Sequence, residues 1–377
     1  DRVTVARFPA CATFNWSADY HLITWLRASV HAEADPRRAH WFVVPFLAKC
    51  VAGKQYKGDL RRLAQRLASL MGELQGRPQW AAHPERHLFF FMSGAGATVV
   101  ADPPGWRGVP NLARAVFVGL EGDREAPYVR EGHDVVVPGY VEASMVDTAR
   151  LAPSVAQRTN YTAFFRGRMD QSISLANGTR APRPNALRQA LNRSLAGAPG
   201  FLFTDEHRGL HTCYRELQRS RFAIVPRGNT PWTQRFYDAI ICGAVPVVLS
   251  DPVQLPYERF LDYPRFMAKV PERAHGRVAR AVLGVPEGEY RRMHAEGLAH
   301  RAAFLYGDRG FAEELFVAEL SYRWNRTRGL PAEPAEPRTA NGPTRFWGPP
   351  PRGAYVVPHA SKLGPTFEGG GRSHRAA

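Results

Sequence analysis

The chain has 377 residues, 44% of them hydrophobic and 11% aromatic, and it carries a formal net charge of +16 at pH 7. This apolar content excludes an unfolded chain, and the length suits two domains of about 150 to 200 residues each. Only five of the 50 basic residues are lysine. Such an arginine excess suits anionic partners such as nucleotide sugars, acidic glycans or nucleic acid. A compositional bias spread over the whole chain explains the larger share of it.

The sequence contains no run of about eighteen uninterrupted apolar residues and no basic segment followed by an apolar one. Because the chain starts at Asp1, we expect a luminal portion whose membrane anchor is absent from this sequence. The four cysteines permit two disulfides, and Cys242 lies in an apolar helical pattern that favours a buried thiol. Five glycosylation sequons are weak evidence for a secretory compartment: Asn15, Asn160, Asn177, Asn192 and Asn325.

In the first half, short apolar runs typical of buried strands alternate with helical patterns. Leucines at helical spacing predict a helix over residues 60–74. The expected strands lie at residues 41–46, 88–92, 115–118 and 134–138. This alternation predicts an α/β layered domain.

The second half opens with a polar stretch, residues 170–185, that could be an interdomain loop, followed by a helix over 185–195. The tail from Pro331 to Ala377 is dense in Pro, Gly and Arg and lacks sustained periodicity. We therefore expect the tail to be irregular.

Residues 221–251 carry the strongest functional signal, because they combine a strand, a polar loop, a helix and a second strand. The first strand ends at Pro226, so Arg227 and Gly228 lie beyond its carboxyl end, where ligands bind in open parallel sheets. Thr230 and Pro231 predict the N-cap and first residue of a helix that ends at Gly243. A helix N-terminus beside such a loop suits a phosphate-bearing ligand.

Arg235, Asp238 and Cys242 share one face of that predicted helix. If this face meets the ligand, Asp238 can accept hydrogen bonds from ribose hydroxyls and Arg235 can hold phosphate oxygens. The alternative is that the two charges pair with each other on a solvated face. The spacing alone does not distinguish these interpretations.

Residues 221–263 resemble the signature block of the exostosin-like, GT47-type glycosyltransferases. The matching motifs there are Val225-Pro226-Arg227-Gly228, Arg235-Phe236-Tyr237-Asp238-Ala239, Cys242-Gly243-Ala244-Val245-Pro246-Val247 and Leu255-Pro256-Tyr257-Glu258. Four earlier segments match the family in type and order: residues 35–46, 86–91, 134–138 and 164–168. The resemblance covers about residues 15 to 325, and the combination of motifs is more specific than any one of them.

This resemblance implies a GT-B fold, in which two Rossmann-like domains face a central cleft. The acceptor-side domain would comprise residues 1–165, the donor-binding domain residues 166–330, and the irregular tail residues 331–377. Family members are inverting transferases that commonly use UDP-sugars. They act in the Golgi lumen as type II membrane proteins. The implied substrates are a nucleotide sugar and a glycan or glycoprotein acceptor, and related transferases are the implied oligomeric partners.

Carried over by position, the donor site contains Arg227, Gly228, Arg235 and Asp238, with Asp238 holding the ribose. Arg166 and Arg168 fall on a basic Phe-Arg-Gly turn that faces the diphosphate. Glu258 matches the acidic residue after Leu-Pro-aromatic and is the tentative catalytic residue.

Glycosyl transfer requires stabilisation of the charge that grows on the leaving nucleoside diphosphate. The sequence has no Asp-x-Asp motif for a divalent metal. We therefore expect no metal or other cofactor, with arginines and a helix N-terminus in that role. Inversion also needs a base. Relatives often carry an acidic residue after the Phe-rich strand, where this chain has Ser93-Gly94-Ala95-Gly96, so the base is unassigned.

Two rival functions follow from the sequence. The missing acid suits a catalytically inactive or regulatory partner of an active transferase. The net charge alone suits a nucleic-acid binder, but the arginines are spread along the chain without a clustered basic helix, so we expect no nucleic-acid partner.

Overall fold

The computed structural model describes residues 7–56, 60–92, 111–126, 130–150, 154–174 and 180–329. All of them belong to the first of the chain's two compact units, residues 1–339. The predicted irregular tail, residues 331–377, and the glycine-containing segment 93–96 lie outside the described residues. Within the described part the protein is α/β, with two parallel sheets, as the sequence predicts.

The first sheet has the strand order β1-β2-β3-β5, and every neighbouring pair is parallel. Its strands are β1 (Phe42–Val44), β2 (His87–Phe91), β3 (Val116–Gly119) and β5 (Val135–Val136), which confirms the four predicted strands. The predicted helix over 60–74 is α4 (Leu60–Gln75). Its residues Leu63, Leu67 and Met71 are buried in one core with Phe89 and Phe91 of β2. The helical stripe therefore packs against the sheet.

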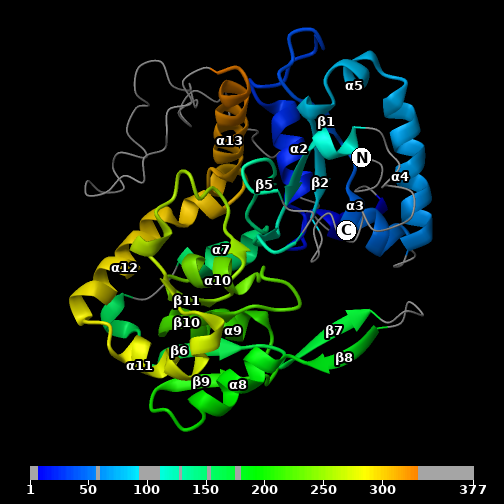
Figure 1. Ribbon diagram of the computed structural model, residues 1–377. Coiled ribbons are helices and arrows are strands. Elements are labelled where there is room, and N and C mark those ends of the chain that lie inside the picture. The colour runs from blue at the N-terminus through cyan, green and yellow to red at the C-terminus, as the bar shows by residue number, and fades with distance from the viewer. Residues whose placement is uncertain are drawn as a thin grey trace, which may run out of the picture. The chain divides into compact units, whose positions relative to one another are not determined.

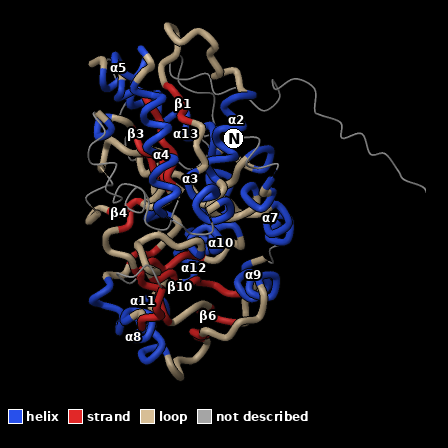
Figure 2. The backbone as a smooth tube through the Cα atoms, turned by 90° about the vertical axis from the view of Figure 1, so that its right-hand side faces the viewer, coloured by secondary structure: helices blue, strands red, loops and turns tan. Residues whose placement is uncertain are grey.

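The second sheet has the order β13-β11-β10-β6-β9 and is also parallel throughout. Its strands are β6 (Tyr161–Arg166), β9 (Phe201–Thr204), β10 (Ser220–Pro226), β11 (Val245–Leu249) and β13 (Ala268–Lys269). Strands β10 and β11 are completely or almost completely buried, as their continuous apolar sequence requires. Figure 2 shows helices against both groups of strands.

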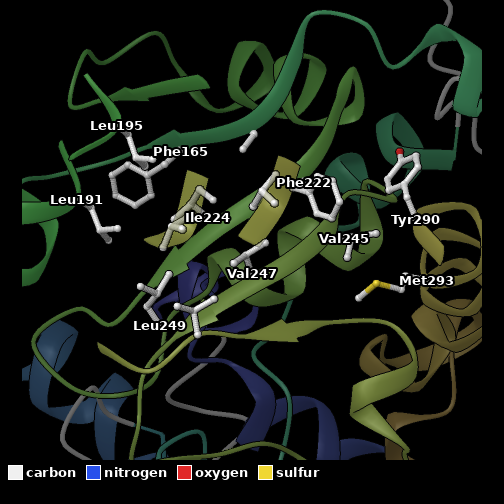
Figure 3. Packing of buried hydrophobic residues seen from close by; sticks show 14 residues of the cluster. Phe165, Leu191, Leu195, Phe222, Ile224, Val245, Val247, Leu249, Tyr290 and Met293 are labelled. Carbon is white, nitrogen blue, oxygen red and sulfur yellow. The ribbon is translucent and has the colours of Figure 1, made fainter. Parts of the chain in front are cut away.

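Helices from different parts of the chain supply the core of the second sheet. Figure 3 shows Leu191 and Leu195 of one helix near Phe165, and Tyr290 of another helix near Phe222 and Val245. That core receives residues from α8 (Ala186–Leu195), α11 (Val278–Leu283) and α12 (Glu287–His300). Helices α9 (Leu210–Gln218) and α10 (Arg235–Ile241) also contact this sheet.

Two contacts join segments that are far apart in sequence. Helix α13 (Ala312–Thr327) packs on the first sheet, where Phe316 lies 6.2 Å from Phe90 between ring centroids, and it contacts α2 (Ala18–Ala28). Strand β4 (Gly122–Asp123) pairs antiparallel with β12 (Val253–Gln254). The segment after β3 is thereby attached to the segment after β11.

Two predictions about local structure are wrong. Within the range 170–185, which we expected to be a loop, β7 (Asp170–Ser174) and β8 (Arg180–Pro184) are antiparallel strands, drawn in Figure 1. Helix α10 begins at Arg235 and not at Pro231. Thr230 does not cap it, because its hydroxyl donates to the carboxylate of Glu121.

The remaining elements are short, apart from α7. They are α3 (Ala48–Cys50), α5 (Pro78–Ala82), α7 (Ala143–Arg150), η1 (Pro9–Ala12), η2 (Val51–Gln55), η3 (Pro84–Arg86), η4 (Leu112–Arg114), η5 (Val155–Gln157), η6 (Tyr263–Arg265), η7 (Glu272–Arg277), η8 (Arg301–Phe304) and η9 (Gly307–Arg309).

Cys11 and Cys50 form a disulfide with Cα atoms 5.6 Å apart, whereas Cys213 and Cys242 are free. Cys242 is buried, as the sequence predicts. Among the described helices, none combines the length and the apolar character that crossing a membrane requires.

Candidate functional site

The candidate site lies where β6 and β10 end. These strands are parallel neighbours, so the loops that follow Arg166 and Pro226 leave the same edge of the sheet. This is the carboxyl edge, the usual ligand-binding side of an open parallel sheet. Both loops belong to the predicted donor site.

Arg188, in the first turn of α8, joins the two loops. The cap of this helix is Asn185, whose side chain accepts a hydrogen bond from the Arg188 backbone N–H at 3.1 Å. The Arg188 guanidinium donates to the main-chain oxygens of Arg168 at 2.8 Å and of Arg227 at 3.0 Å. A third, longer bond of 3.4 Å goes to Pro226. Arg188 is only 7% exposed, so these carbonyls replace water around a buried cation.

Arg235, the first residue of α10, brings a second cation to the same place. Its Nε and Nη2 donate to the main-chain oxygen of Arg166 at 3.0 and 2.8 Å. The guanidinium carbon of Arg235 lies 4.6 Å from the centre of the Phe165 ring, and that of Arg188 lies 5.5 Å from the same centre. Within the described ranges, neither guanidinium forms an ion pair with a carboxylate.

The electrostatics of these two arginines favour an added anion. Burial and the neighbouring charge of Arg235 lower the pKa of Arg188 to about 9. Burial likewise lowers the pKa of Arg235, and the charge of Asp238 opposes this shift. The two guanidinium charges lie over the same Phe165 ring and repel each other, which raises the energy of the unliganded site. A dianion such as a diphosphate would relieve this repulsion and accept bidentate hydrogen bonds.

Arg166 is near this pair but has different partners. Its Nε and Nη2 bind the carboxylate of Glu216, both at 3.1 Å, and its Nη1 lies 3.2 Å from Glu206 Oε2. The side chain is therefore neutralised within the protein. The sequence predicts that Arg166 faces the diphosphate. In the structure its main-chain oxygen contacts Arg235 and its side chain reaches α9 and the loop before it.

Asp238 lies one turn along α10 from Arg235. Its Oδ1 accepts a hydrogen bond from the Tyr214 hydroxyl at 2.6 Å and a longer one from Gln234 at 3.4 Å. Burial raises the pKa of Asp238 to about 6, although the Tyr214 bond and the charge of Arg235 lower it. Asp238 and Arg235 thus hydrogen-bond to different partners, and the alternative of a simple solvated pair does not describe this helix.

The other predicted donor residues lie along the two loops. Arg227 Nη1 is 3.5 Å from Glu272 Oε1, with both side chains partly exposed, and the Arg168 side chain is exposed. The N–H of Gly228 donates to the main-chain oxygen of Thr230 at 3.0 Å. A Cβ on Gly228 would lie 3.4 Å from Arg188 Nη2, about van der Waals contact, so the loop lies against Arg188 at this position.

Glu258 has a local role in the structure. Its Oε1 accepts a hydrogen bond from the Leu255 N–H at 2.8 Å, and its Oε2 lies 2.5 Å from Arg124 Nη2. The neighbouring Tyr257 has a φ of 56°, which few non-glycine residues adopt. Glu258 therefore holds a tight turn together and pairs with the segment after β4.

The sequence does not predict Arg188 as a site residue, nor the two polar partners on α9, Tyr214 and Glu216. One signal for Arg188 exists in the sequence. It is a cation in the first turn of a predicted helix, where the helix dipole disfavours positive charge. Nothing in the spacing of α9 indicates that Tyr214 contacts Asp238, since 24 residues separate them.

Comparison with known proteins places this chain in a family. Residues 9–282 match the family model of the exostosin GT47 domain, and the chain belongs to this family. The domain that contains the arginine pair is therefore that of a glycosyltransferase family, which confirms the resemblance seen in the sequence motifs.

Three curated relatives are named as transferases. The probable glucuronoxylan glucuronosyltransferase F8H of Arabidopsis thaliana is 27% identical over 270 residues, which span 70% of this chain and 56% of that protein. The probable glucuronosyltransferase Os01g0926400 of Oryza sativa subsp. japonica is 24% identical, over 76% of this chain and 67% of its own length. The probable beta-1,4-xylosyltransferase IRX10L of Arabidopsis thaliana is 26% identical, over 66% of this chain and 60% of its own length. The match thus spans roughly three fifths of these relatives.

Proposed function

We propose that this protein is an inverting glycosyltransferase that moves a sugar from a nucleotide-sugar donor to a glycan or glycoprotein acceptor. The observation that carries the proposal is the pair Arg188 and Arg235 over Phe165. The pair lies at the carboxyl edge of a parallel sheet, where the family membership leads us to expect a donor. The names of the relatives make UDP-glucuronic acid and UDP-xylose the first donors to test.

In this proposal the donor diphosphate lies against Arg188 and Arg235, beside Arg227 and Gly228. The bond from the anomeric carbon to the diphosphate oxygen breaks, and the leaving group keeps the electron pair. The two guanidiniums stabilise the added negative charge, a contribution that grows toward the transition state. We propose that this arrangement needs no metal or other cofactor, in line with the lack of an Asp-x-Asp motif in the sequence.

Asp238 is the proposed acceptor of hydrogen bonds from the ribose hydroxyls. Its Oδ1 already binds Tyr214. A carboxylate has about four acceptor positions, so this bond leaves capacity for a ribose. Arg166 and Arg168 contribute mainly through their main-chain oxygens, which hold Arg235 and Arg188 in place.

The broader setting follows the family. We propose a GT-B arrangement with donor binding in residues 166–330 and the acceptor facing residues 1–165. We also propose a place in the Golgi lumen, as part of a type II membrane protein that assembles with related transferases.

Transfer from UDP-glucuronic acid and UDP-xylose to xylo-oligosaccharides tests this function. We expect release of UDP and extension of the acceptor by the wild type with one of these donors, and a loss of at least tenfold in kcat/KM for Arg188→Met. Arg291→Met is the matched control, because Arg291 pairs with Glu287 on an exposed helix face.

The outcomes also separate the rival interpretation. UDP binding without transfer, with any donor in a wider UDP-sugar panel, would favour a catalytically inactive partner of a transferase. Absence of both UDP binding and transfer would contradict the proposed function.

A further inference from the structure

Glu121 is a buried carboxylate that the donor site does not use. It follows β3 at the carboxyl edge of the first sheet, immediately before β4, and it is 6% exposed. Burial of an ionised acidic side chain costs free energy unless ion pairs and hydrogen bonds compensate for the lost hydration. Its position at a ligand-binding edge makes it a candidate for chemistry.

The contacts of Glu121 connect it to the donor loop. Its Oε1 accepts a hydrogen bond from the hydroxyl of Thr230. The main-chain oxygen of Thr230 in turn accepts a hydrogen bond from the N–H of Gly228 at 3.0 Å, and Gly228 lies against Arg188. Three consecutive contacts therefore lead from the proposed diphosphate site to this carboxylate.

The segment that holds Glu121 is fixed in place. Gly122 and Asp123 of β4 pair with Gln254 and Val253 of β12. The next residue, Arg124, donates its N–H to the Pro252 oxygen at 2.9 Å. The main chain is thus held by β3 before Glu121 and by these bonds after it, which helps to preorganise the side chain, as a catalytic group requires.

The neighbouring groups act on the ionisation of Glu121 in both directions. Burial, the dominant cause, raises its pKa to about 9, and the charge of Asp123 adds to this shift. The Thr230 hydroxyl and the charge of Lys49 favour the ionised form, so they oppose this upward shift of the pKa. Once ionised, such a carboxylate is a strong proton acceptor, because burial destabilises its charged form.

A feature suited to a sugar lies next to Lys49. Its Nζ lies 4.7 Å from the centre of the Trp16 ring, and Trp16 is partly exposed. Aromatic rings bind the apolar faces of sugars while adjacent polar groups bind the hydroxyls. Lys49 thus has a partly exposed aromatic ring beside it, and its charge acts on the Glu121 carboxylate.

We propose that Glu121 is the general base of the reaction, a role that the sequence leaves unassigned. In the transfer step the acceptor O–H bond breaks and its proton moves to the Glu121 carboxylate. The acceptor oxygen forms the new bond to the anomeric carbon, and the bond to the diphosphate breaks with its electron pair on UDP. Deprotonation of Glu121 by solvent then completes the cycle. This inference rests on the proposed transferase function.

The test compares Glu121→Gln with the wild type, using the UDP-sugar that the wild type turns over and a xylo-oligosaccharide acceptor. The amide keeps the acceptor for Thr230 but takes no proton. We expect kcat to fall at least about 100-fold, with the Kd for UDP within about twofold of the wild-type value. Glu121→Asp keeps a carboxylate and should restore part of the rate. The matched control is Glu313→Gln, since Glu313 is also a buried carboxylate with a raised pKa, near 7, in the first turn of α13.

The pH profile separates a base from a structural residue. The wild-type kcat/KM should rise about tenfold per pH unit below a pKa near 9, and the residual rate of Glu121→Gln should lose this rise. Thr230→Val removes a bond that favours the ionised form, so the rising limb should move to higher pH.

The results distinguish this inference from the proposed function. If the wild type transfers sugar and Glu121→Gln keeps its kcat and its pH profile, the base assignment is overturned and the transferase function stands. If the wild type neither binds UDP nor transfers sugar, both are overturned.

Discussion

Arg166 and the pair Arg188 and Arg235 lie at the same edge of the second sheet but have different kinds of partners. Arg166 binds two glutamates, one of them through two hydrogen bonds. Arg188 and Arg235 bind main-chain oxygens, which are dipoles without net charge. Burial alone therefore does not identify a ligand-binding arginine. A ligand-binding arginine is identified by a positive charge that its hydrogen-bond partners do not neutralise.

This difference has an energetic basis. A buried ion pair satisfies its own charges and contributes to the folded structure, whereas a buried cation among carbonyls retains a full positive charge. An incoming anion therefore gains more from Arg188 and Arg235 than from Arg166. Substitutions should separate the two roles, with stability affected at Arg166 and ligand affinity at the pair.

The largest effect is expected on stability, from Arg166→Met. The variant leaves the mostly buried Glu216 without its cation, and breaking such a pair costs about 3–5 kcal/mol. Chemical denaturation should show this loss of unfolding free energy. In the double variant with Glu216→Gln, part of the loss should return. If Arg166→Met is as stable as the wild type, the distinction between the ion-paired Arg166 and the pair Arg188 and Arg235 is wrong.

Arg235→Met should affect ligand binding next most strongly. We expect the Kd for UDP to rise about tenfold to one hundredfold, because a charge-assisted hydrogen bond to the diphosphate is lost. Calorimetry measures this, with the exposed Arg291→Met as control. An unchanged Kd would exclude Arg235 from the donor site.

Asp238 gives a pH-dependent prediction. Its native pKa of about 6 lies above its ordinary value of 3.8, so between pH 4 and 6 the native state binds more protons than the unfolded state. As the pH rises from 4 to 6, the unfolding free energy of the wild type should therefore fall relative to that of Asp238→Asn, by on the order of 2 kcal/mol. Above this pH range the difference between the two proteins should stay nearly constant.

Denaturation of both proteins at pH 4, 5, 6 and 7 checks this. Asn keeps an acceptor for the Tyr214 hydroxyl, so the comparison isolates the charge. A difference that does not change with pH would show that Asp238 ionises as an ordinary aspartate does.

The smallest effect is expected from Gly167→Ala. An added Cβ at Gly167 overlaps the guanidinium of Arg235, which is the flexible end of a side chain and can move. We expect the Kd for UDP to rise a few-fold, on the order of 1 kcal/mol, with little change in stability. The control is Gly53→Ala, because a Cβ there meets no heavy atom within 4 Å. Equal UDP affinity of both variants would mean that the position of Arg235 does not matter for binding.

The sequence predicts the elements of the fold well where apolar periodicity is strong. The stripe that includes Leu63 and Leu67 defines α4, and the buried runs define the central strands. The hairpin β7–β8 is missed because its polar residues and its prolines, Pro182 and Pro184, are typical of a loop. The start of α10 is missed because Thr230 has a tertiary partner, Glu121, that competes with the capping role.

The site is only partly predictable from the sequence, because its side chains also depend on tertiary partners. Arg227, Gly228 and Arg235 are recognisable because they lie on a strand-loop-helix motif within one short segment. The partners of each arginine come from other segments. Arg188 reaches Arg227 across 39 residues and Arg166 reaches Glu216 across 50, so sequence spacing does not indicate which arginine is neutralised.

The central claim is that Arg188 and Arg235 bind the diphosphate of the donor. Calorimetric titration of UDP and of uridine, into the wild type and into Arg188→Met, tests it most directly, because the two ligands differ only in the diphosphate. We expect the wild type to bind UDP at least about 100-fold more tightly than uridine, and Arg188→Met to reduce this ratio about tenfold or more without changing the uridine affinity. Equal ratios in the two proteins would contradict the claim.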